Sequence, residues 1–293
     1  MPSFTELLAG PRVLLADGAT GTNYQAMGLE PGVAPEEWVL DAPERVMELH
    51  RRFAEAGSDL VLTCTFGATG IRLADGPLAG RAREVNVRAA ELAREAVGET
   101  LLVAGSLGPT GKLVEPYGDL TQEAAVDAYA EQARALADGG VDLLVLETFF
   151  ALEEALWAID GVTGATELPL VASFSFDQGT RTMMGVSAAD VVAAIVPLGV
   201  AAVGANCGRS LADTDALVAE LLEAAPAVPL WIKPNAGVPH VVGDEVVYEA
   251  GPDELAAHVR RYADAGARVV GGCCGSTPEH VAAIARALGR PTR

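Results

Sequence analysis

Three of the four cysteines in this chain stand beside glycines at the ends of apolar runs. Cys273 and Cys274 are adjacent in the run Gly-Gly-Cys-Cys-Gly at 271–275, and Cys207 lies in Gly-Ala-Asn-Cys-Gly at 204–208. Because glycine lacks a Cβ atom, it lets the backbone turn tightly and lets an ion or ligand approach closely. Thiolates are preferred ligands of zinc, and three protein ligands with one open position characterise a catalytic site. The sequence therefore predicts a catalytic zinc site formed by Cys207, Cys273 and Cys274.

Each cysteine also has a simpler interpretation. A free cysteine is often only a small buried apolar side chain, and this is the role we predict for Cys64, because nothing near it in sequence completes a site. For the other three, inert packing is the alternative to zinc. A disulfide between Cys273 and Cys274 would need a strained ring, and an acidic chain without a signal peptide is expected in a reducing compartment.

Asp17 begins the segment Asp-Gly-Ala-Thr-Gly-Thr at 17–22, directly after an apolar run. A carboxylate beside exposed backbone N–H groups can receive a free amino acid: the acid pairs with the ammonium, and the amides hold the carboxylate. Gly18, Ala19 and Thr20 would supply those amides. An Asp-Gly pair after a strand is more often only a turn, and this alternative stays open.

Two further polar residues end apolar runs. Glu147, in Leu-Glu-Thr-Phe at 146–149, would be a second anchor for a substrate ammonium or a structural carboxylate at a strand end. Asn235, in Lys-Pro-Asn-Ala-Gly at 233–237, offers a side-chain oxygen. That oxygen could fill the open position of zinc when substrate is absent, or the residue could merely make a turn.

The elements that must position these residues alternate along the chain as short apolar runs and longer amphipathic ones. Near-continuously apolar runs are typical of strands covered on both faces. Eight strand–helix units without a second domain predict one (β/α)8 TIM barrel domain over residues 1–293, with an open doubly wound sheet as the main alternative. The predicted strands are Val13–Asp17, Asp59–Cys64, Leu101–Gly105, Asp142–Glu147, Pro169–Phe174, Val200–Asn206, Val228–Ile232 and Arg268–Gly272, and helical patterns include Pro43–Gly57, Thr121–Gly139, Ser187–Leu198 and Pro252–Gly266.

In a barrel of this type the active site lies where the carboxyl ends of the strands meet. Asp17, Glu147 and the three predicted ligand cysteines all fall at or after the carboxyl ends of predicted strands. They are therefore expected to share one rim. The long loops Lys233–Gly251 and Phe66–Pro77 would lie at the same mouth as lids.

Composition restricts the partners. The chain has 40 acidic and 20 basic residues, a formal net charge of −20. Such a surface repels nucleic acid and anionic membranes. With no apolar run of about 18 residues, no membrane span is expected. We predict a cytoplasmic protein and leave open whether it forms a homo-oligomer.

Several motifs occur together, in order, along nearly the whole chain. In this combination the sequence resembles the zinc-dependent homocysteine S-methyltransferase family, and the double-cysteine run is the most specific mark. The motifs are Asp-Gly-Ala-Thr-Gly-Thr at 17–22, Gly-Pro-Thr-Gly at 108–111, Leu-Glu-Thr at 146–148, Asn-Cys at 206–207, Pro-Asn-Ala-Gly at 234–237 and Gly-Gly-Cys-Cys-Gly at 271–275.

The resemblance implies a β/α barrel in which Cys207, Cys273 and Cys274 bind zinc and serve catalysis. In relatives an oxygen ligand fills the fourth zinc position until the substrate thiol displaces it, and Asn235 matches that place in one branch.

The resemblance also implies that Asp17, Glu147 and the amides near Ala19 and Thr20 hold the amino-acid part of homocysteine. Few alkyl thiols are ionised at neutral pH. Zinc would deprotonate the homocysteine thiol, and the sulfur would then attack the donor methyl in line, giving methionine.

The methyl donor is expected to be a separate molecule, because the chain ends at residue 293 without folate or cobalamin modules. The segments 108–111 and 116–118 resemble the homocysteine-binding module of cobalamin-dependent methionine synthase, and the stretch 38–58 has some similarity to the betaine-using branch. We predict a corrinoid-bound methyl group, of the methylcobalamin type. A small onium compound such as S-methylmethionine, betaine or another sulfonium is the alternative, for which Tyr24, Trp38 and Phe149 could offer aromatic faces.

Two other classes of function remain at this point. One is a barrel enzyme with different chemistry, such as a metal-free lyase. The other is a thiol- or zinc-binding module without turnover.

Overall fold

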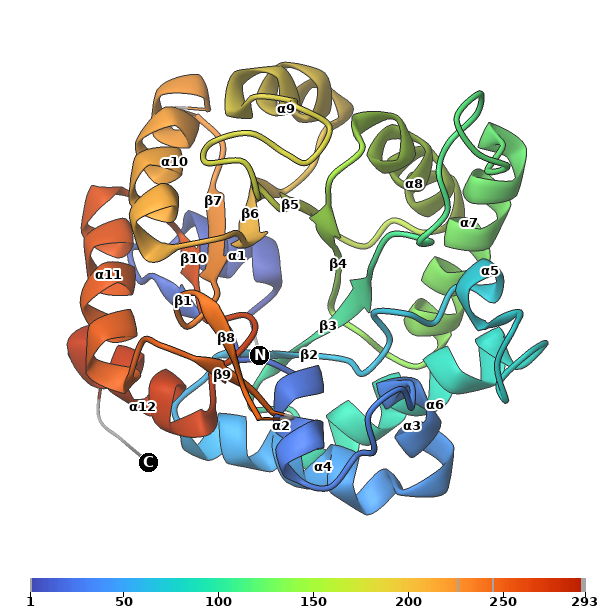
Figure 1. Ribbon diagram of the computed structural model, residues 1–293, viewed down its shortest axis with the longest axis horizontal. Coiled ribbons are helices and arrows are strands. Elements are labelled where there is room, and N and C mark those ends of the chain that lie inside the picture. Colours follow the sequence, from blue (N-terminus) through green and yellow to red (C-terminus); the bar gives the residue numbers. More distant parts are fainter. Residues whose placement is uncertain (1, 226, 244, 291–293) are drawn as a thin grey trace.

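The computed structural model describes residues 2–225, 227–243 and 245–290. Within these ranges, eight parallel strands form a nearly closed barrel, and helices alternate with them to make an outer ring (Figure 1). This is a (β/α)8 TIM barrel, which confirms the predicted fold class. The barrel strands are β1 (Leu14–Leu15), β2 (Leu60–Leu62), β3 (Leu102–Leu107), β4 (Leu143–Phe149), β5 (Leu170–Phe174), β6 (Ala202–Cys207), β7 (Leu230–Pro234) and β10 (Val269–Val270).

The outer helices begin at residues whose chemistry favours a helix start. The hydroxyls of Thr121 and Ser187 accept hydrogen bonds from backbone N–H groups in the first turns of α7 and α9. Prolines stand in the first turns of α4, α11 and α12, where a missing N–H leaves no bond unmade. The helices of the ring are α4 (Pro43–Glu55), α6 (Ala82–Val97), α7 (Gln122–Asp138), α8 (Leu152–Ala165), α9 (Ala188–Ile195), α10 (Leu211–Ala224), α11 (Pro252–Ala265) and α12 (Pro278–Ala287).

The strand order is β1-β10-β7-β6-β5-β4-β3-β2, so β1 and β2 are the two edges that must meet to close the barrel. Aspartate residues join them. The Asp59 N–H donates to the Leu15 carbonyl at 2.7 Å, and the Leu15 N–H donates to the Asp59 carboxylate at 2.8 Å. The Leu62 N–H donates to the Asp17 carboxylate at 2.7 Å. Side-chain carboxylates therefore close the seam between β1 and β2.

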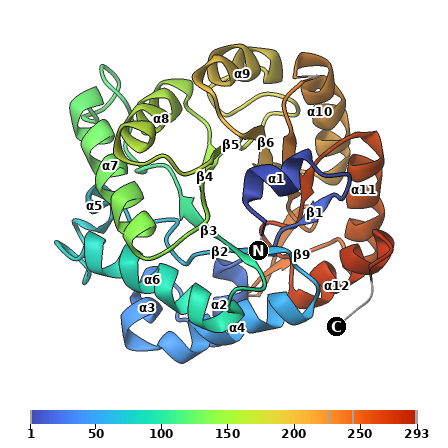
Figure 2. The same cartoon turned by 180° about the vertical axis from the view of Figure 1, so that it is seen from behind.

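One end of the barrel is sealed by a short helix that the sequence patterns did not predict. Helix α1 (Phe4–Ala9) lies across the barrel on the face seen in Figure 2. Its Phe4 and Leu8 are buried with apolar side chains of the barrel interior, including Leu60 and Trp231. Burying such a side chain stabilises the fold by roughly 1.5–3 kcal/mol. Ligands are therefore expected to enter from the opposite end.

The loops at that opposite end contain short elements of their own. The predicted loop Lys233–Gly251 contains an antiparallel hairpin of β8 (Pro239–Val242) and β9 (Glu245–Tyr248), which lies in front of the barrel in Figure 1. The remaining short elements are α2 (Gly21–Ala26), η1 (Pro35–Glu37), α3 (Trp38–Asp41), α5 (Gly70–Leu73) and η2 (Val196–Leu198).

The predicted strands and helices are all found, with shifted ends. Strands β3 and β4 each run two residues further than predicted. The helix predicted at Ser187–Leu198 changes to the tighter η2 after Ile195, at a point where Pro197 lacks the N–H that an α-helix requires. None of the helices in the described part of the chain is long and apolar enough to cross a membrane.

Candidate active site

The fold brings the three predicted ligand cysteines together although they are distant in sequence. Cys207 ends β6, and Cys273 and Cys274 follow β10; β7 lies between these strands in the sheet. The three sulfur atoms lie within 4.8 Å of one another, and those of Cys207 and Cys273 are 3.0 Å apart. Such a cluster could hold a metal ion, and three soft thiolates suit a zinc site with one open position.

The cluster already favours one thiolate. Hydrogen bonds from the thiols of Cys207 and Cys273 lower the pKa of Cys274. The pKa of Cys207 is raised well above its usual range, because its proton is held in hydrogen bonds with Cys273 and Cys274. A metal ion must displace the remaining protons, so metal affinity is expected to increase with pH.

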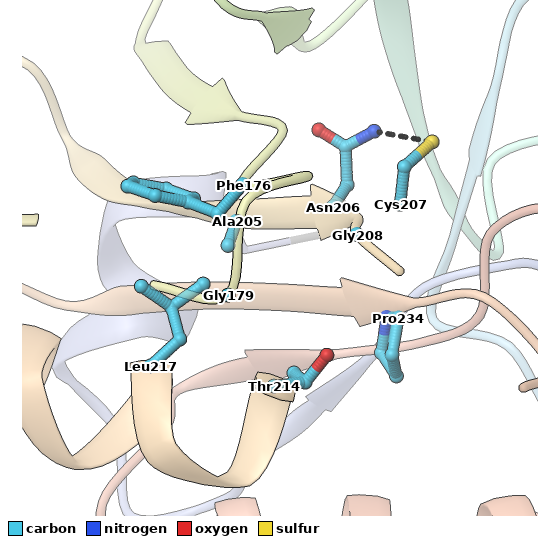
Figure 3. Close-up of a pocket in the computed structure, with 9 residues that line it drawn as sticks. All are labelled: Phe176, Gly179, Ala205, Asn206, Cys207, Gly208, Thr214, Leu217 and Pro234. Atoms are coloured by element: carbon cyan, nitrogen blue, oxygen red, sulfur yellow. Dashed lines mark hydrogen bonds between the residues drawn. The ribbon is translucent and has the colours of Figure 1, made fainter. Parts of the chain in front are cut away.

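The buried amide of Asn206 connects this cluster to strands β4 and β5, and Figure 3 shows it turned toward Cys207. Its oxygen accepts hydrogen bonds from the Thr148 N–H at 2.8 Å and the Ser173 hydroxyl at 2.7 Å. Its nitrogen donates to the Thr148 hydroxyl at 2.6 Å and lies 3.6 Å and 3.7 Å from the sulfurs of Cys207 and Cys273. Asn206 is thus a hydrogen-bond donor aimed at two of the three sulfurs.

Two residues held by this amide have left-handed backbones. The φ angle is 63° at Thr148 and 61° at Cys207. A β-branched residue such as threonine rarely adopts this conformation, and the strain costs on the order of 1–3 kcal/mol. Thr148 belongs to a bulge in β4, where the register with β5 shifts between Leu146 and Phe149. Bulges of this kind redirect side chains and are common beside active sites.

A cavity of about 610 Å³ opens beside the cysteine cluster, at the carboxyl ends of the strands. This volume lies in the range of small-molecule binding sites, and its place is that of the active site in barrels of this type. All three clustered cysteines line it, and Cys64 lines another part of its wall. Its charged lining residues in the described part of the chain are Glu36, Arg72, Glu147 and Lys233.

Glu147 reaches the cavity from the bulge of β4. Its carboxylate accepts a hydrogen bond from the Ser106 hydroxyl. Burial raises the pKa of Glu147 to about 7, although the nearby charge of Lys233 acts in the opposite direction. At neutral pH this group is therefore divided between the acid and the carboxylate. A bound ammonium would favour the carboxylate.

Asp17 lies beneath the cavity and is already engaged. The Lys233 ammonium lies 2.7 Å from one carboxylate oxygen, and the Leu62 N–H occupies the other. Burial alone would lower the pKa of Lys233, but Asp17 and Glu147 outweigh it, so the pKa is raised. Of this buried pair, Lys233 lines the cavity, and its ammonium lies close to the carboxylates of Asp17 and Glu147. The predicted contact between Asp17 and a substrate ammonium stays a prediction.

The segment after β1 forms part of the cavity wall. A Cβ atom at Gly18 would come within 2.8 Å of both the Phe53 ring and the Ser276 carbonyl, which explains the glycine. The Ala19 N–H is used, since it donates to Ser276. For the N–H group of Thr20, just before α2, no acceptor is found among the described residues. Thr20 can therefore receive a ligand carboxylate more readily than Ala19 can.

Asn235 joins the loops that carry the cysteines. Its nitrogen donates to the Gly208 carbonyl at 2.8 Å, and its oxygen accepts from the Cys274 N–H at 3.0 Å. The oxygen is thus engaged with the backbone. The role of fourth zinc ligand in the absence of substrate stays a prediction.

Among the residues that the structure describes, the aromatic side chain in the cavity wall is not one of those proposed from the sequence. Tyr24 and Phe149 are buried in the core, and the rings of Tyr24 and Trp38 lie 5.3 Å apart, packed on each other. Phe66 lines the cavity instead. Its position two residues after Cys64, just past a predicted strand end, was the available signal.

Three polar residues near the cavity were not among the predicted site residues. Asn206 and Lys233 were quoted only as parts of motifs, yet a lysine near the end of an apolar strand was a usable signal. Glu36 is 5% exposed and lines the cavity. It follows no predicted strand directly, so its sequence position gave no sign of this burial.

Comparisons with known proteins agree with this geometry. The family model for homocysteine S-methyltransferase matches residues 14–288. The methionine synthase of Mycobacterium leprae is 32% identical over 297 residues, which cover 95% of this chain. The chain spans only 24% of the length of that protein.

Solved structures show the same relationship. The metallated form of the homocysteine methyltransferase MmuM from Escherichia coli is 29% identical, with a TM-score of 0.81 over 95% of this chain and 97% of that one. The carboxyl transferase domain of Rhizobium etli pyruvate carboxylase, 15% identical with a TM-score of 0.57, shares the fold alone. With its cysteine cluster, its cavity and a family match over most of its length, this chain belongs to the homocysteine S-methyltransferase family.

Proposed function

We propose that this protein transfers a methyl group to the sulfur of homocysteine, giving methionine, with zinc held by Cys207, Cys273 and Cys274. The observation that carries the proposal is that the cysteine cluster and the buried Glu147 line one cavity. When bound, zinc lowers the pKa of the substrate thiol so that a thiolate is available at neutral pH.

The residues around the cavity then have distinct roles. The Glu147 carboxylate pairs with the homocysteine ammonium, a charge-assisted contact. The backbone N–H of Thr20 and the Lys233 ammonium bind the carboxylate of homocysteine. Asp17 acts through Lys233, which it keeps charged and in place. Asn206 holds two of the ligand sulfurs in position.

The methyl transfer itself is a displacement. A bond forms between the homocysteine sulfur and the methyl carbon while the bond from that carbon to the donor atom breaks. The electron pair of the broken bond leaves with the donor, and the thiol proton has already passed to solvent. The protein contributes by orienting the two reactants and by excluding water from the buried half of the cavity.

For the donor, the sequence motifs favour a corrinoid methyl group carried by another protein, which would need an open, shallow mouth. The cavity of about 610 Å³ and its second buried acid, Glu36, favour a small onium donor such as S-methylmethionine, betaine or another sulfonium. We therefore place the small cation first and keep the corrinoid methyl as the alternative.

The test is a donor screen on the purified protein with its metal content measured. Zinc near one ion per chain and methionine formation from homocysteine with an onium donor are expected. Methionine from methylcobalamin alone would reverse the order of the donors. Turnover without zinc would favour a metal-free enzyme, and zinc without methionine from any donor would indicate a binding module.

A further inference from the structure

One buried serine joins the double-cysteine turn to the segment after β1. Ser276 directly follows the run Gly-Gly-Cys-Cys-Gly at 271–275 and is fully buried. Strands β1 and β10 lie side by side, but they pair over only two residues (Figure 1). Beyond this short ladder, in the proposed function, the Cys273–Cys274 turn holds the sulfur end of homocysteine and Thr20 binds its carboxylate end. The contacts beyond the ladder therefore help to set the distance between these two ends.

Ser276 makes hydrogen bonds to both segments. Its hydroxyl donates to the Cys273 carbonyl at 2.6 Å. The Ala19 N–H donates to the carbonyl oxygen and to the hydroxyl oxygen of Ser276, each at 3.1 Å. The Asn23 side-chain amide donates to the Ser276 carbonyl at 2.9 Å and to the Ala19 carbonyl at 2.6 Å. The Ser276 hydroxyl thus connects the cysteine turn directly to the backbone just before Thr20.

Two glycines make room for this serine. A Cβ atom at Gly18 would come within 2.9 Å of the Ser276 hydroxyl oxygen, and one at Gly272 would come within 2.6 Å of the Ser276 Cβ. Neither glycine has a left-handed φ angle, so the close approach of Ser276, and not the backbone conformation, accounts for the missing side chains. Because the serine is closely packed and hydrogen-bonded on both sides, it holds the two segments at one separation.

This separation matters for a ligand that must reach both ends at once. Homocysteine has two methylene groups between its sulfur and its α-carbon, whereas cysteine has one. A ligand with two anchoring groups gains affinity from both only when its length matches the distance between the two binding points. A site with a fixed separation can therefore distinguish two thiols that carry the same functional groups.

We propose that Ser276 is a positioning residue that sets the distance between the sulfur end and the carboxylate end of the acceptor site. It thereby selects an α-amino acid with its thiol on the γ-carbon over one with its thiol on the β-carbon. Ser276 acts through the backbone of Cys273 and Ala19 and does not itself bind the ligand. This inference rests on the proposed methyl transfer to homocysteine.

The test removes the hydroxyl and compares three thiols on the zinc-loaded protein by calorimetry. The ligands are homocysteine, cysteine and 1-propanethiol, which has the homocysteine chain without its amino-acid group. Ser276→Ala keeps the carbonyl that Ala19 and Asn23 contact. We expect homocysteine affinity to fall about fivefold or more, while the affinities for cysteine and 1-propanethiol change by less than about twofold. The preference for homocysteine over cysteine should therefore decrease.

Two further variants accompany this one. Asn23→Ala weakens the same connection from α2 and should show the same selective loss, so it decides the question if Ser276→Ala does not fold. Ser58→Ala is the matched control, because Ser58 is also buried and its hydroxyl has no hydrogen-bond partner among the described residues. All three affinities should be unchanged in Ser58→Ala. Zinc content and thermal unfolding curves report whether each variant folds.

The outcomes separate positioning from a general structural role. An equal loss for homocysteine and 1-propanethiol would show a general disturbance of the site and would overturn the positioning role. An unchanged preference for homocysteine over cysteine would overturn it as well.

The donor screen distinguishes this inference from the proposed function. Methionine formation together with an unchanged preference in Ser276→Ala would remove the positioning role and leave the methyl transfer. A selective loss of homocysteine binding in Ser276→Ala, without methionine from any donor, would support the positioning role and remove the methyl transfer.

Discussion

The two ends of the cavity are built differently. At the cysteine end, side chains come from strands β4, β6 and β7 and from the turn after β10. The Asn206 amide donates toward two of the sulfurs, and the Asn235 amide oxygen accepts from the Cys274 N–H. At the Glu36 end, the wall comes from residues 34–36, in the connection between β1 and β2, and from the loop after β2; among the described residues, one hydrogen bond from the Gly67 N–H holds the acid. In the described part of the chain, the two non-glycine residues with left-handed backbones, Thr148 and Cys207, both lie at the first end.

This difference has a consequence for specificity. A site on strands keeps its geometry when loops change, because barrel strands are held on both sides. Loops tolerate substitution and insertion. In the proposed function, the cysteine end is therefore suited to one fixed acceptor, and the Glu36 end can be adapted to different donors.

The largest effect on the protein is expected from removal of one predicted ligand sulfur. Cys273→Ser is expected to lose zinc and to reduce methyl transfer to background, because serine is a poor zinc ligand at neutral pH. Cys64→Ser, which changes a thiol at another part of the wall, should retain zinc. Metal analysis of both variants decides, and a full complement of zinc in Cys273→Ser would remove the ligand assignment.

A smaller effect is expected at the acceptor anchor. Glu147→Gln should weaken homocysteine binding about 10- to 100-fold, the value of one charge-assisted hydrogen bond. With a pKa of about 7, Glu147 is protonated below neutrality and cannot pair with an ammonium there. Homocysteine affinity should therefore rise as the pH increases to about 7, and this rise should be absent in Glu147→Gln.

Calorimetric titrations between about pH 5.5 and 8.5, the range around the Glu147 transition, measure that difference. A simple alkyl thiol without an amino group is the control ligand, and its affinity should change little in Glu147→Gln. An equal loss for both ligands would exclude Glu147 from the amino-acid pocket.

Substitution of Asn206 tests whether hydrogen bonds hold the sulfurs of the cysteine end in place. Asn206→Asp keeps the shape but replaces an N–H donor with a carboxylate beside two sulfurs, so zinc affinity should fall by about tenfold or somewhat more. Ser173→Ala removes a partner of the amide oxygen and leaves the nitrogen facing the sulfurs. Competition with a chromogenic chelator compares the two, and a larger loss in Ser173→Ala would contradict the role of the nitrogen.

The smallest effect is expected at the hairpin. Tyr248 packs against Gly275, and burial and the negative charge of Cys274 raise its pKa. Tyr248→Phe keeps the packing and removes a hydroxyl near Cys274. A loss of zinc affinity of about fivefold is expected, which corresponds to one hydrogen bond worth about 1 kcal/mol. A loss as large as that in Asn206→Asp would show that the β8–β9 hairpin helps to hold the cysteine end in place.

The barrel and the cysteine cluster were predictable because their signals are local. Each buried strand is a short apolar run, and Cys207, Cys273 and Cys274 directly follow such runs, so the topology alone brings them to one rim. Glu147 was predicted as a site residue for the same reason, because it ends one of these apolar runs.

Other features depend on tertiary contacts that no local pattern reveals. Lys233 occupies the carboxylate of Asp17, which sequence reasoning had left free for substrate. Glu36 is buried only because the loop after β2 folds over it and donates the Gly67 N–H. Helix α1 is too short for a clear periodic pattern, and its role became visible only from its packing beneath the barrel.

Hydrogen exchange at the seam between β1 and β2 can report whether the cavity is occupied. The Leu62 amide is protected by the Asp17 carboxylate, so its hydrogen exchange depends on a side chain that can rotate, unlike the amides within the parallel ladders. The same carboxylate is paired with Lys233 beside the cavity. A ligand that recruits Lys233 is therefore expected to alter the exchange rate at Leu62, so that deuterium uptake at one strand edge reports the occupancy of the cavity that Leu62 helps to line.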